Sequence, residues 1–128
     1  MVMTDSPLPC FSHFLERYPC HDTTLVLVAH MLDTSIPFVL GLAKALEIHL
    51  VIPIPYSVTE SARSAIAAQV PVARISALDA LPAEVIGAVR TACSCKQNVV
   101  LQDVGGYAAD HVEKLATLSK TASRVFLL

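Results

Sequence analysis

Tryptophan is absent from this sequence, and charged residues make up only 16% of it. The nine lysines and arginines are scattered along the chain, and no basic run is interleaved with aromatic residues. Proteins that bind nucleic acid usually carry a basic patch or stripe that neutralises phosphates. The net charge of −2 and this scattered pattern therefore argue against nucleic acid as the main partner.

Long hydrophobic runs are also missing, although hydrophobic residues make up 54% of the chain and the mean hydropathy is +0.58. A membrane-spanning helix needs about 20 consecutive apolar residues, and the longest apolar run, near Ile48–Pro55, is interrupted by prolines. We therefore expect buried strands and one exposed apolar face, which would serve as a homo-oligomer interface or be covered by a missing domain. Met1–Pro9 has no secretory signal or lipidation motif, so we expect a cytoplasmic protein without a membrane partner.

The four cysteines do not form a metal-binding pattern. Cys93 and Cys95 are too close together for the usual zinc-binding pair. The spacing of Cys10 and Cys20 is too long for it. We therefore predict reduced thiols and no metal site.

Short apolar runs alternate with helix-forming segments, and one domain of this length can bury a substantial core. We predict strands at Thr23–Ala29, Ile48–Pro53, Val70–Ile75, Asn98–Gln102 and Ser123–Leu128. Helices are predicted at Phe11–Tyr18, from Asp33, Thr34 or Ser35 to Leu46, from Ser57 or Thr59 to Gln69, at Leu81–Thr91 and at Ala108–Lys120. This alternation is typical of a three-layer α/β sandwich with a mostly parallel five-stranded sheet, either flavodoxin-like or Rossmann-like. The sandwich would comprise residues 23–128, and residues 1–22 would form an N-terminal extension with the short helix.

Ligands of such sheets bind outside the carboxyl ends of the strands, which directs attention to three loops, 30–36, 53–60 and 102–108. His30 follows the first strand and could bind a ligand hydroxyl or move a proton near neutral pH. Asp33, Thr34 and Ser35 could bind polar ligand atoms. The alternative is that His30 bonds to a nearby backbone carbonyl and that the loop only caps a helix.

The loop after the fourth predicted strand contains Asp103, Gly105 and Gly106. Paired glycines permit positive φ and let a ligand approach the backbone, and a helix begins just beyond them. The alternative is a tight turn in which Asp103 is a solvated helix cap. The two glycines do not make the glycine-rich fingerprint of a dinucleotide-binding strand end.

Other polar residues near the predicted strand ends are Tyr56, Ser57 and Thr59. Tyr56 could stack on a base or lie as an aromatic residue on the rim. His111 is expected to be a surface residue. The sequence contains no serine-nucleophile elbow, phosphate-binding P-loop or zinc-protease motif.

Three stretches in chain order resemble the N-terminal substrate-binding domain of the S-adenosylhomocysteine hydrolase family. They are His30-Met31, Val58-Thr59-Glu60-Ser61 and Gln102-Asp103-Val104-Gly105-Gly106-Tyr107, and the likeness covers about Thr24 to Leu115. The resemblance implies that His30 is a catalytic or sugar-contacting histidine. It also implies that Asp103 is the acid near the ribose, with the other strand-end residues around the substrate.

The sequence also departs from this family. Val104 stands where the family has its acid, directly before the two glycines, and Leu32 stands where it has a threonine. The family oxidises the ribose with NAD held by a separate glycine-rich domain, and these 128 residues contain no such fingerprint. We therefore expect no cofactor in this chain, and NAD only if a downstream domain exists.

Three hypotheses follow from this pattern. The leading one is a domain that binds an adenosyl or other small polar ligand within a hydrolase-like protein and is not catalytic by itself; the finish at Arg124–Leu128 favours a piece of a longer protein. The second is an assembly module that binds no metabolite. The third is a small enzyme with His30 as base and Asp103 as its partner, which requires the two side chains within hydrogen-bonding reach or bridged by one water.

Overall fold

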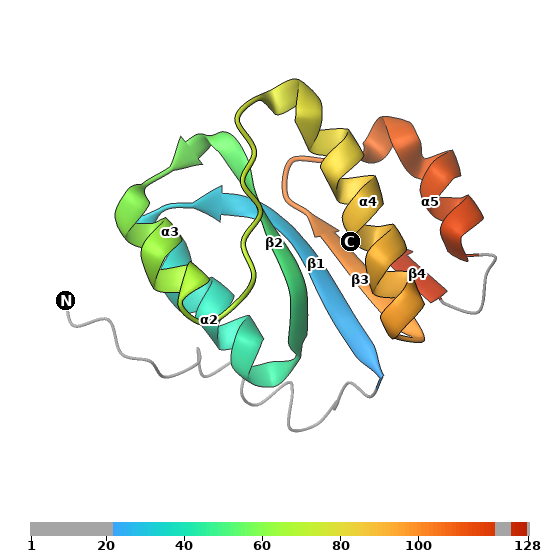
Figure 1. Cartoon of the computed structure of the whole chain (residues 1–128), viewed down its shortest axis with the longest axis horizontal. Coiled ribbons are helices and arrows are strands. Elements are labelled where there is room, and N and C mark those ends of the chain that lie inside the picture. The colour runs from blue at the N-terminus through green and yellow to red at the C-terminus, as the bar shows by residue number, and fades with distance from the viewer. Residues whose placement is uncertain (1–21, 120–123, 128) are drawn as a thin grey trace.

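The computed structural model describes residues 22–119 and 124–127 (Figure 1). The predicted helix at Phe11–Tyr18 and nearly all of the predicted N-terminal extension lie outside the described residues. From Thr23 onward, strands and helices alternate along the chain as the hydrophobic pattern predicts, except that α3 (Glu60–Ala67) is followed by α4 (Leu81–Cys95) with no strand between them.

Four parallel strands form one sheet, which confirms the predicted α/β class. β1 (Thr23–Met31) lies between β2 (Glu47–Val58) and β3 (Asn98–Asp103), and β4 (Arg124–Leu127) lies beyond β3. All three neighbouring strand pairs are parallel. The middle position of β1 follows from its sequence, because a nearly unbroken apolar run can be buried on both faces of a sheet.

The third predicted strand, Val70–Ile75, in which Pro71 indicates an irregular or edge position, does not form as a regular strand. This segment runs past β2 and forms one isolated parallel bridge with it, between Val51 and Val72. The backbone N–H of Val51 donates to the carbonyl of Pro71, and that of Ala73 donates to Val51. Proline has no N–H to extend a ladder. The sheet of the described residues therefore has four strands.

β2 continues past its predicted end at Pro53 and changes register there. Ala29 of β1 pairs with Pro53, whereas Met31 pairs with Val58. All residues of β2 between these two pairs therefore lie opposite His30. Regular pairing stops at this point because a proline cannot donate to the ladder, and the extra residues form an irregular bulge.

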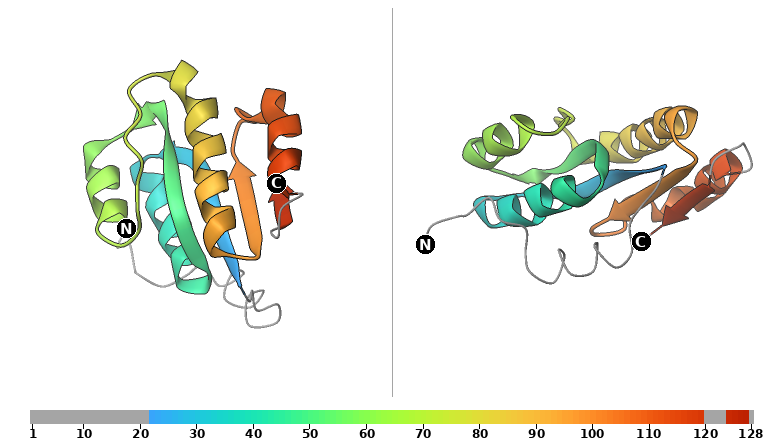
Figure 2. Two further views of the ribbon diagram at one scale, coloured as in Figure 1. Left: turned by 45° about the vertical axis from the view of Figure 1, so that its right-hand side comes forward. Right: turned by 90° about the horizontal axis from the view of Figure 1, so that it is seen from below.

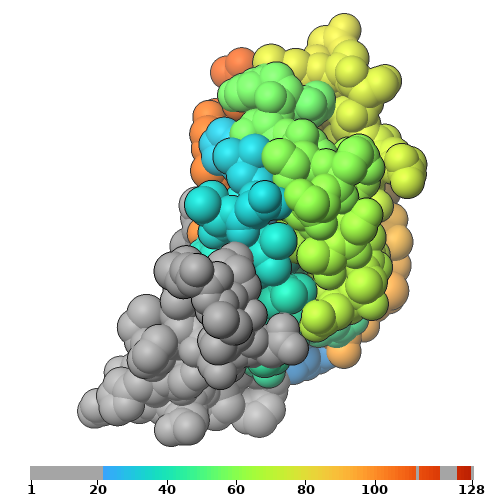
Figure 3. All heavy atoms as spheres, turned by 90° about the vertical axis from the view of Figure 1, so that its left-hand side faces the viewer, coloured from blue at the N-terminus to red at the C-terminus, as the bar shows by residue number. Residues whose placement is uncertain are grey.

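The helices of the described part connect the strands and cover the sheet. They are α2 (Ile36–Ala45), α3 (Glu60–Ala67), α4 (Leu81–Cys95) and α5 (Val112–Ser119), with short 3-10 helices at Asp33–Ser35 (η1), Leu78–Ala80 (η2) and Ala109–His111 (η3). Figure 2 shows α4 on one side of the sheet and α2 on the other. α3 packs beside α2, as the green and teal surfaces in Figure 3 show.

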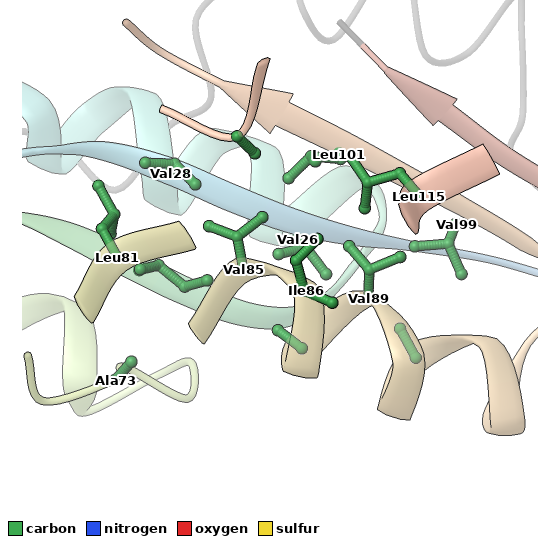
Figure 4. Close-up of a cluster of buried hydrophobic side chains, with 14 of the residues drawn as sticks. Val26, Val28, Ala73, Leu81, Val85, Ile86, Val89, Val99, Leu101 and Leu115 are labelled. Carbon is green, nitrogen blue, oxygen red and sulfur yellow. The ribbon is translucent and has the colours of Figure 1, made fainter. Parts of the chain in front are cut away.

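Two apolar cores hold these layers together. In the first, Val26 and Val28 of β1 pack with Val85 and Val89 of α4, and Leu115 of α5 joins them (Figure 4). Burial of such a side chain contributes roughly 1.5–3 kcal/mol. This core fixes α4 and α5 against β1 and β3.

The second core lies on the other face of β1. Leu27 and Met31 of β1 pack with Val39 of α2 and Ile66 of α3. Alternate residues of β1 thus enter opposite cores, as the pleat of a strand requires. The two cores hold the carboxyl end of β1 from both sides, so the loops that follow it start from a rigid base.

Candidate functional site

The carboxyl ends of β1 and β3 lie side by side, so the loops after them meet at one edge of the sheet. Val28 of β1 is paired with Asp103 of β3, and the N–H of Val104 donates to the carbonyl of Val28 at 3.1 Å. His30 lies two residues beyond Val28 along β1. In the upper half of Figure 3, blue atoms of the first described segment lie beside orange atoms from the later part of the chain. The topology therefore brings the first and the fourth predicted strands together, as the site hypothesis requires.

His30 is exposed, and its Nδ1 lies 2.8 Å from the hydroxyl oxygen of Ser57 in β2. This hydrogen bond forms with either tautomer of the ring, because a hydroxyl can donate or accept. The partner of His30 is thus a side-chain hydroxyl, in place of the backbone carbonyl considered as the alternative. The bulge in β2 makes the contact possible, because it places Ser57 opposite the end of β1.

A small pocket opens beside His30 at the end of β1. Its volume is about 260 Å³. The residues that line this strand-end pocket are Ala29, His30, Thr34, Ser35, Phe38 and Val104. Most of the wall is apolar, with polar groups from one histidine and two hydroxyl residues. That composition is typical of small-molecule sites, in which a few polar groups orient a ligand against an apolar surface.

The two hydroxyl residues of the pocket differ in their surroundings. The hydroxyl of Ser35 accepts a hydrogen bond from the N–H of Leu32 at 3.3 Å, so it holds the start of η1. Thr34 is exposed at the pocket. Thr34 is therefore the hydroxyl residue better placed to contact a ligand.

Asp103 uses one carboxylate oxygen to hold the turn after β3. Its Oδ2 accepts from the N–H of Ala108 at 2.7 Å, which is the capping role considered as the alternative. Its Oδ1 is buried and has no hydrogen-bond partner among the described residues. A buried acceptor without a donor costs about 1–3 kcal/mol. The free oxygen therefore favours a donor supplied by a bound molecule or by water.

Gly105 and Gly106 form the tight turn between Asp103 and the next helical turn, with φ of +102° and +69°. The N–H of Gly106 donates to the carbonyl of Asp103 at 3.1 Å. A Cβ on Gly105 would lie 2.6 Å from Cε2 of Tyr107. The first glycine is thus required by its backbone conformation and by the tyrosine packed on it.

Sequence analysis gives Tyr107 no role beyond its place at the end of a motif, yet its side chain connects the loop after β3 to the bulge of β2. Its hydroxyl lies 2.5 Å from the hydroxyl of Tyr56 in the β2 bulge. The hydrogen bond to Tyr56, with burial and the charges of Tyr56 and Asp103, raises the pKa of the Tyr107 phenol above its usual value. Tyr56 itself is 68% exposed, as expected of a residue on the rim.

A second polar cluster joins η1 to the start of α3, and it turns two residues proposed from the sequence as ligand contacts, Asp33 and Thr59, toward each other. Oδ1 of Asp33 accepts from the hydroxyl of Ser61 at 2.7 Å and from that of Thr59 at 3.3 Å. The Thr59 oxygen also accepts from the N–H of Ala62 and caps α3. Thr59, predicted to bind substrate, is therefore occupied in holding two loops together.

His30 and Asp103 do not hydrogen-bond to each other. The His30 ring bonds to Ser57, whereas Asp103 bonds to the backbone of Ala108. Val104, not Asp103, reaches the strand-end pocket. The arrangement thus lacks the direct contact between acid and base, which is one of the two arrangements that the hypothesis of an independent small enzyme allows.

The residues after β1 also do not fit a dinucleotide cofactor. The first strand–helix connection has no glycine that would let a pyrophosphate approach the backbone. Gly105 and Gly106 belong to the later loop, and Tyr107 packs against the first of them. No group of three or more metal-ligating side chains occurs within residues 22–119 and 124–127. No helix in those ranges is long and apolar enough to cross a membrane.

Comparison with known proteins found no match to this chain among family models, curated proteins or solved structures.

Proposed function

We propose that this chain is a small-molecule-binding domain that holds a polar metabolite of the adenosyl or nucleoside type at the carboxyl edge of its sheet. The layout is flavodoxin-like or Rossmann-like, and the domain acts within an adenosylhomocysteinase-like protein without being catalytic by itself. The ligand class comes from the resemblance of the three sequence stretches around His30, Thr59 and Asp103.

The observation that carries this proposal is the strand-end pocket, in which His30 and Thr34 offer polar groups beside an apolar wall. The unpaired Oδ1 of Asp103 lies buried in the neighbouring loop, outside this lining, so a ribose-type hydroxyl could donate to it only if the turn after β3 opened. The apolar surface of Phe38 and Val104 supports a flat ring or an alkyl segment.

Calorimetric titration with adenosine, S-adenosylhomocysteine and NAD tests the proposal. We expect heat with the first two ligands at up to millimolar concentration and none with NAD. The absence of heat with all three would overturn the proposal.

Thr34→Val is the sharpest variant for this titration. Valine keeps the shape of the threonine side chain but removes the hydroxyl that is exposed at the strand-end pocket. We expect the variant to keep the fold and to lose most of the adenosine affinity. Thr117→Val, which removes an exposed hydroxyl from α5, is the matched control and should bind as the unmodified chain does.

An assembly module is the second candidate function, and the edge strand β4 favours it. Phe126 and Leu127 are 47% and 48% exposed there, which is unusual for large apolar side chains on a strand. Light scattering across a range of concentrations tests this candidate. A dimer that Phe126→Lys dissociates would support it, whereas a monomer at all concentrations would count against it.

A further inference from the structure

A second depression lies between α4 and α5, away from the strand-end pocket. Its volume is about 460 Å³, within the range of roughly 300–1,000 Å³ typical of small-molecule sites. α4 contributes Ile86, Gly87 and Arg90, and the segment formed by η3 and α5 contributes His111 and Lys114. We call this depression the α4–α5 groove. It shares no lining residue with the strand-end pocket.

The groove concentrates positive charge on a chain whose net charge is −2. Of its four titratable lining residues, Arg90 and Lys114 are cationic, His111 can become so, and Asp79 is the one acid. In the described part of the chain, neither Arg90 nor Lys114 forms an ion pair with a carboxylate. Both side chains are exposed and therefore keep their charge available to a ligand.

Gly87 leaves space in the middle of this charged region. A Cβ at this position would meet nothing within 4 Å, so the backbone of α4 borders an open volume. Glycine inside a helix is less favourable than alanine by roughly 0.5–1 kcal/mol. No neighbouring element in the described ranges packs so closely against α4 that it would require glycine at position 87. A larger side chain at this position would project into the groove.

We propose that the α4–α5 groove binds a small molecule that carries a phosphate group. A guanidinium donates two parallel hydrogen bonds to phosphate oxygens, and an ammonium adds a compact charge. Arg90 and Lys114 approach the groove from different helices, so one phosphate between them would join α4 to α5. The remaining volume along Ile86 accommodates the uncharged part of the molecule.

Inorganic pyrophosphate is a suitable probe, titrated into the ¹⁵N-labelled chain at constant ionic strength. We expect amide shifts confined to the α4–α5 groove, at residues 82–90 and 111–114. The double variant Arg90→Gln/Lys114→Gln should bind on the order of tenfold more weakly. Lys44→Gln, which removes an exposed cation from α2, should bind as tightly as the unmodified chain.

Gly87→Met provides an independent test, because its side chain should fill the groove without removing a charge. We expect it to weaken pyrophosphate binding while the thermal midpoint stays within a few degrees. Equal affinity in the double variant and the Lys44→Gln control would refute the proposal. Shifts at residues 30–35 and 103–107 in place of the groove would refute it as well, because the anion would then occupy the strand-end site.

Discussion

Gly105→Ala is expected to destabilise the fold by about 3 kcal/mol, which is large for the addition of one methyl group. Gly105 has a φ of +102°, a conformation that costs other residues roughly 1–3 kcal/mol. The new Cβ would also lie 2.6 Å from the Tyr107 ring. The ring must move, and its hydrogen bond to Tyr56 is then lost, which costs about 1 kcal/mol more.

Gly106→Ala is the matched control, because it separates the backbone cost from the cost of displacing the tyrosine. Gly106 has a φ of +69°, and a Cβ there meets nothing within 4 Å. Only the backbone penalty of roughly 1–2 kcal/mol applies. Urea unfolding followed by circular dichroism measures both variants, and the difference between them reports the contact with Tyr107 together with the difference in backbone strain between the two positions.

The double variant Gly105→Ala/Tyr107→Ala completes the cycle. Without the ring, the alanine methyl has room, so adding Gly105→Ala to Tyr107→Ala should cost less than adding it to the unmodified chain. If Gly105→Ala costs no more than Gly106→Ala, or if the two substitutions are simply additive, Tyr107 does not pack on this turn. The account of the loop after β3 would then be wrong.

Three further predictions concern the tyrosine pair, the core and the α3 cap. Tyr56→Phe should lower the pKa of Tyr107 toward its usual value, and ultraviolet titration measures this change. Because the pKa of Tyr107 is raised in the folded state, its contribution to the free energy of unfolding is present below the ordinary tyrosine pKa and is lost as the pH rises through the folded value. The free energy of unfolding should therefore change less with alkaline pH in Tyr56→Phe than in the unmodified chain. Leu101→Ala should lower the free energy of unfolding, measured in urea, by about 3 kcal/mol because the side chain is fully buried. Leu127→Ala, at the residue paired with Leu101 in β4, should lower it by less than about 1 kcal/mol because Leu127 is 48% exposed. Thr59→Ala should cost about 1–2 kcal/mol, and Thr59→Ser should restore most of it because the hydroxyl still caps α3; equal losses in the two variants would refute the capping role.

The parts of the fold that sequence predicts well are those set by local apolar runs. The continuous run in Thr23–Ala29 predicts a strand buried on both faces, and β1 is an interior strand with cores on both sides. Val70–Ile75 also contains β-branched apolar residues, but it includes Pro71 and Arg74 and does not become a regular strand. Pro71 removes one backbone N–H that a regular ladder would use, and the segment forms only an isolated bridge with β2. Composition alone does not show whether a segment pairs along its length or at one residue.

The extent of β2 illustrates a second limit of sequence reasoning. Pro53 and Pro55 predict an early end to the strand, yet the chain rejoins β1 at Val58 after a bulge. This return depends on pairing with Met31, a residue distant in sequence, and no local pattern encodes it. The hydrogen bond between Ser57 and His30 is a consequence of the bulge, so the sequence pattern does not predict it either.

The strand-end site and the α4–α5 groove differ in how far they could be predicted from sequence, because they depend on long-range contacts to different degrees. His30 and Asp103 could be proposed from sequence because one rule places strand ends of a parallel sheet at a common edge. The hydrogen-bond partners of His30 and Asp103 could not be predicted from sequence, because they depend on the positions of side chains to within a few ångströms. The α4–α5 groove is the extreme case, since Arg90, His111 and Lys114 look scattered in the sequence and meet only when two helices pack side by side. A chain with no basic stripe can therefore still present a compact positive surface, and the absence of a charge pattern in sequence excludes extended polyanions more securely than it excludes a single phosphate.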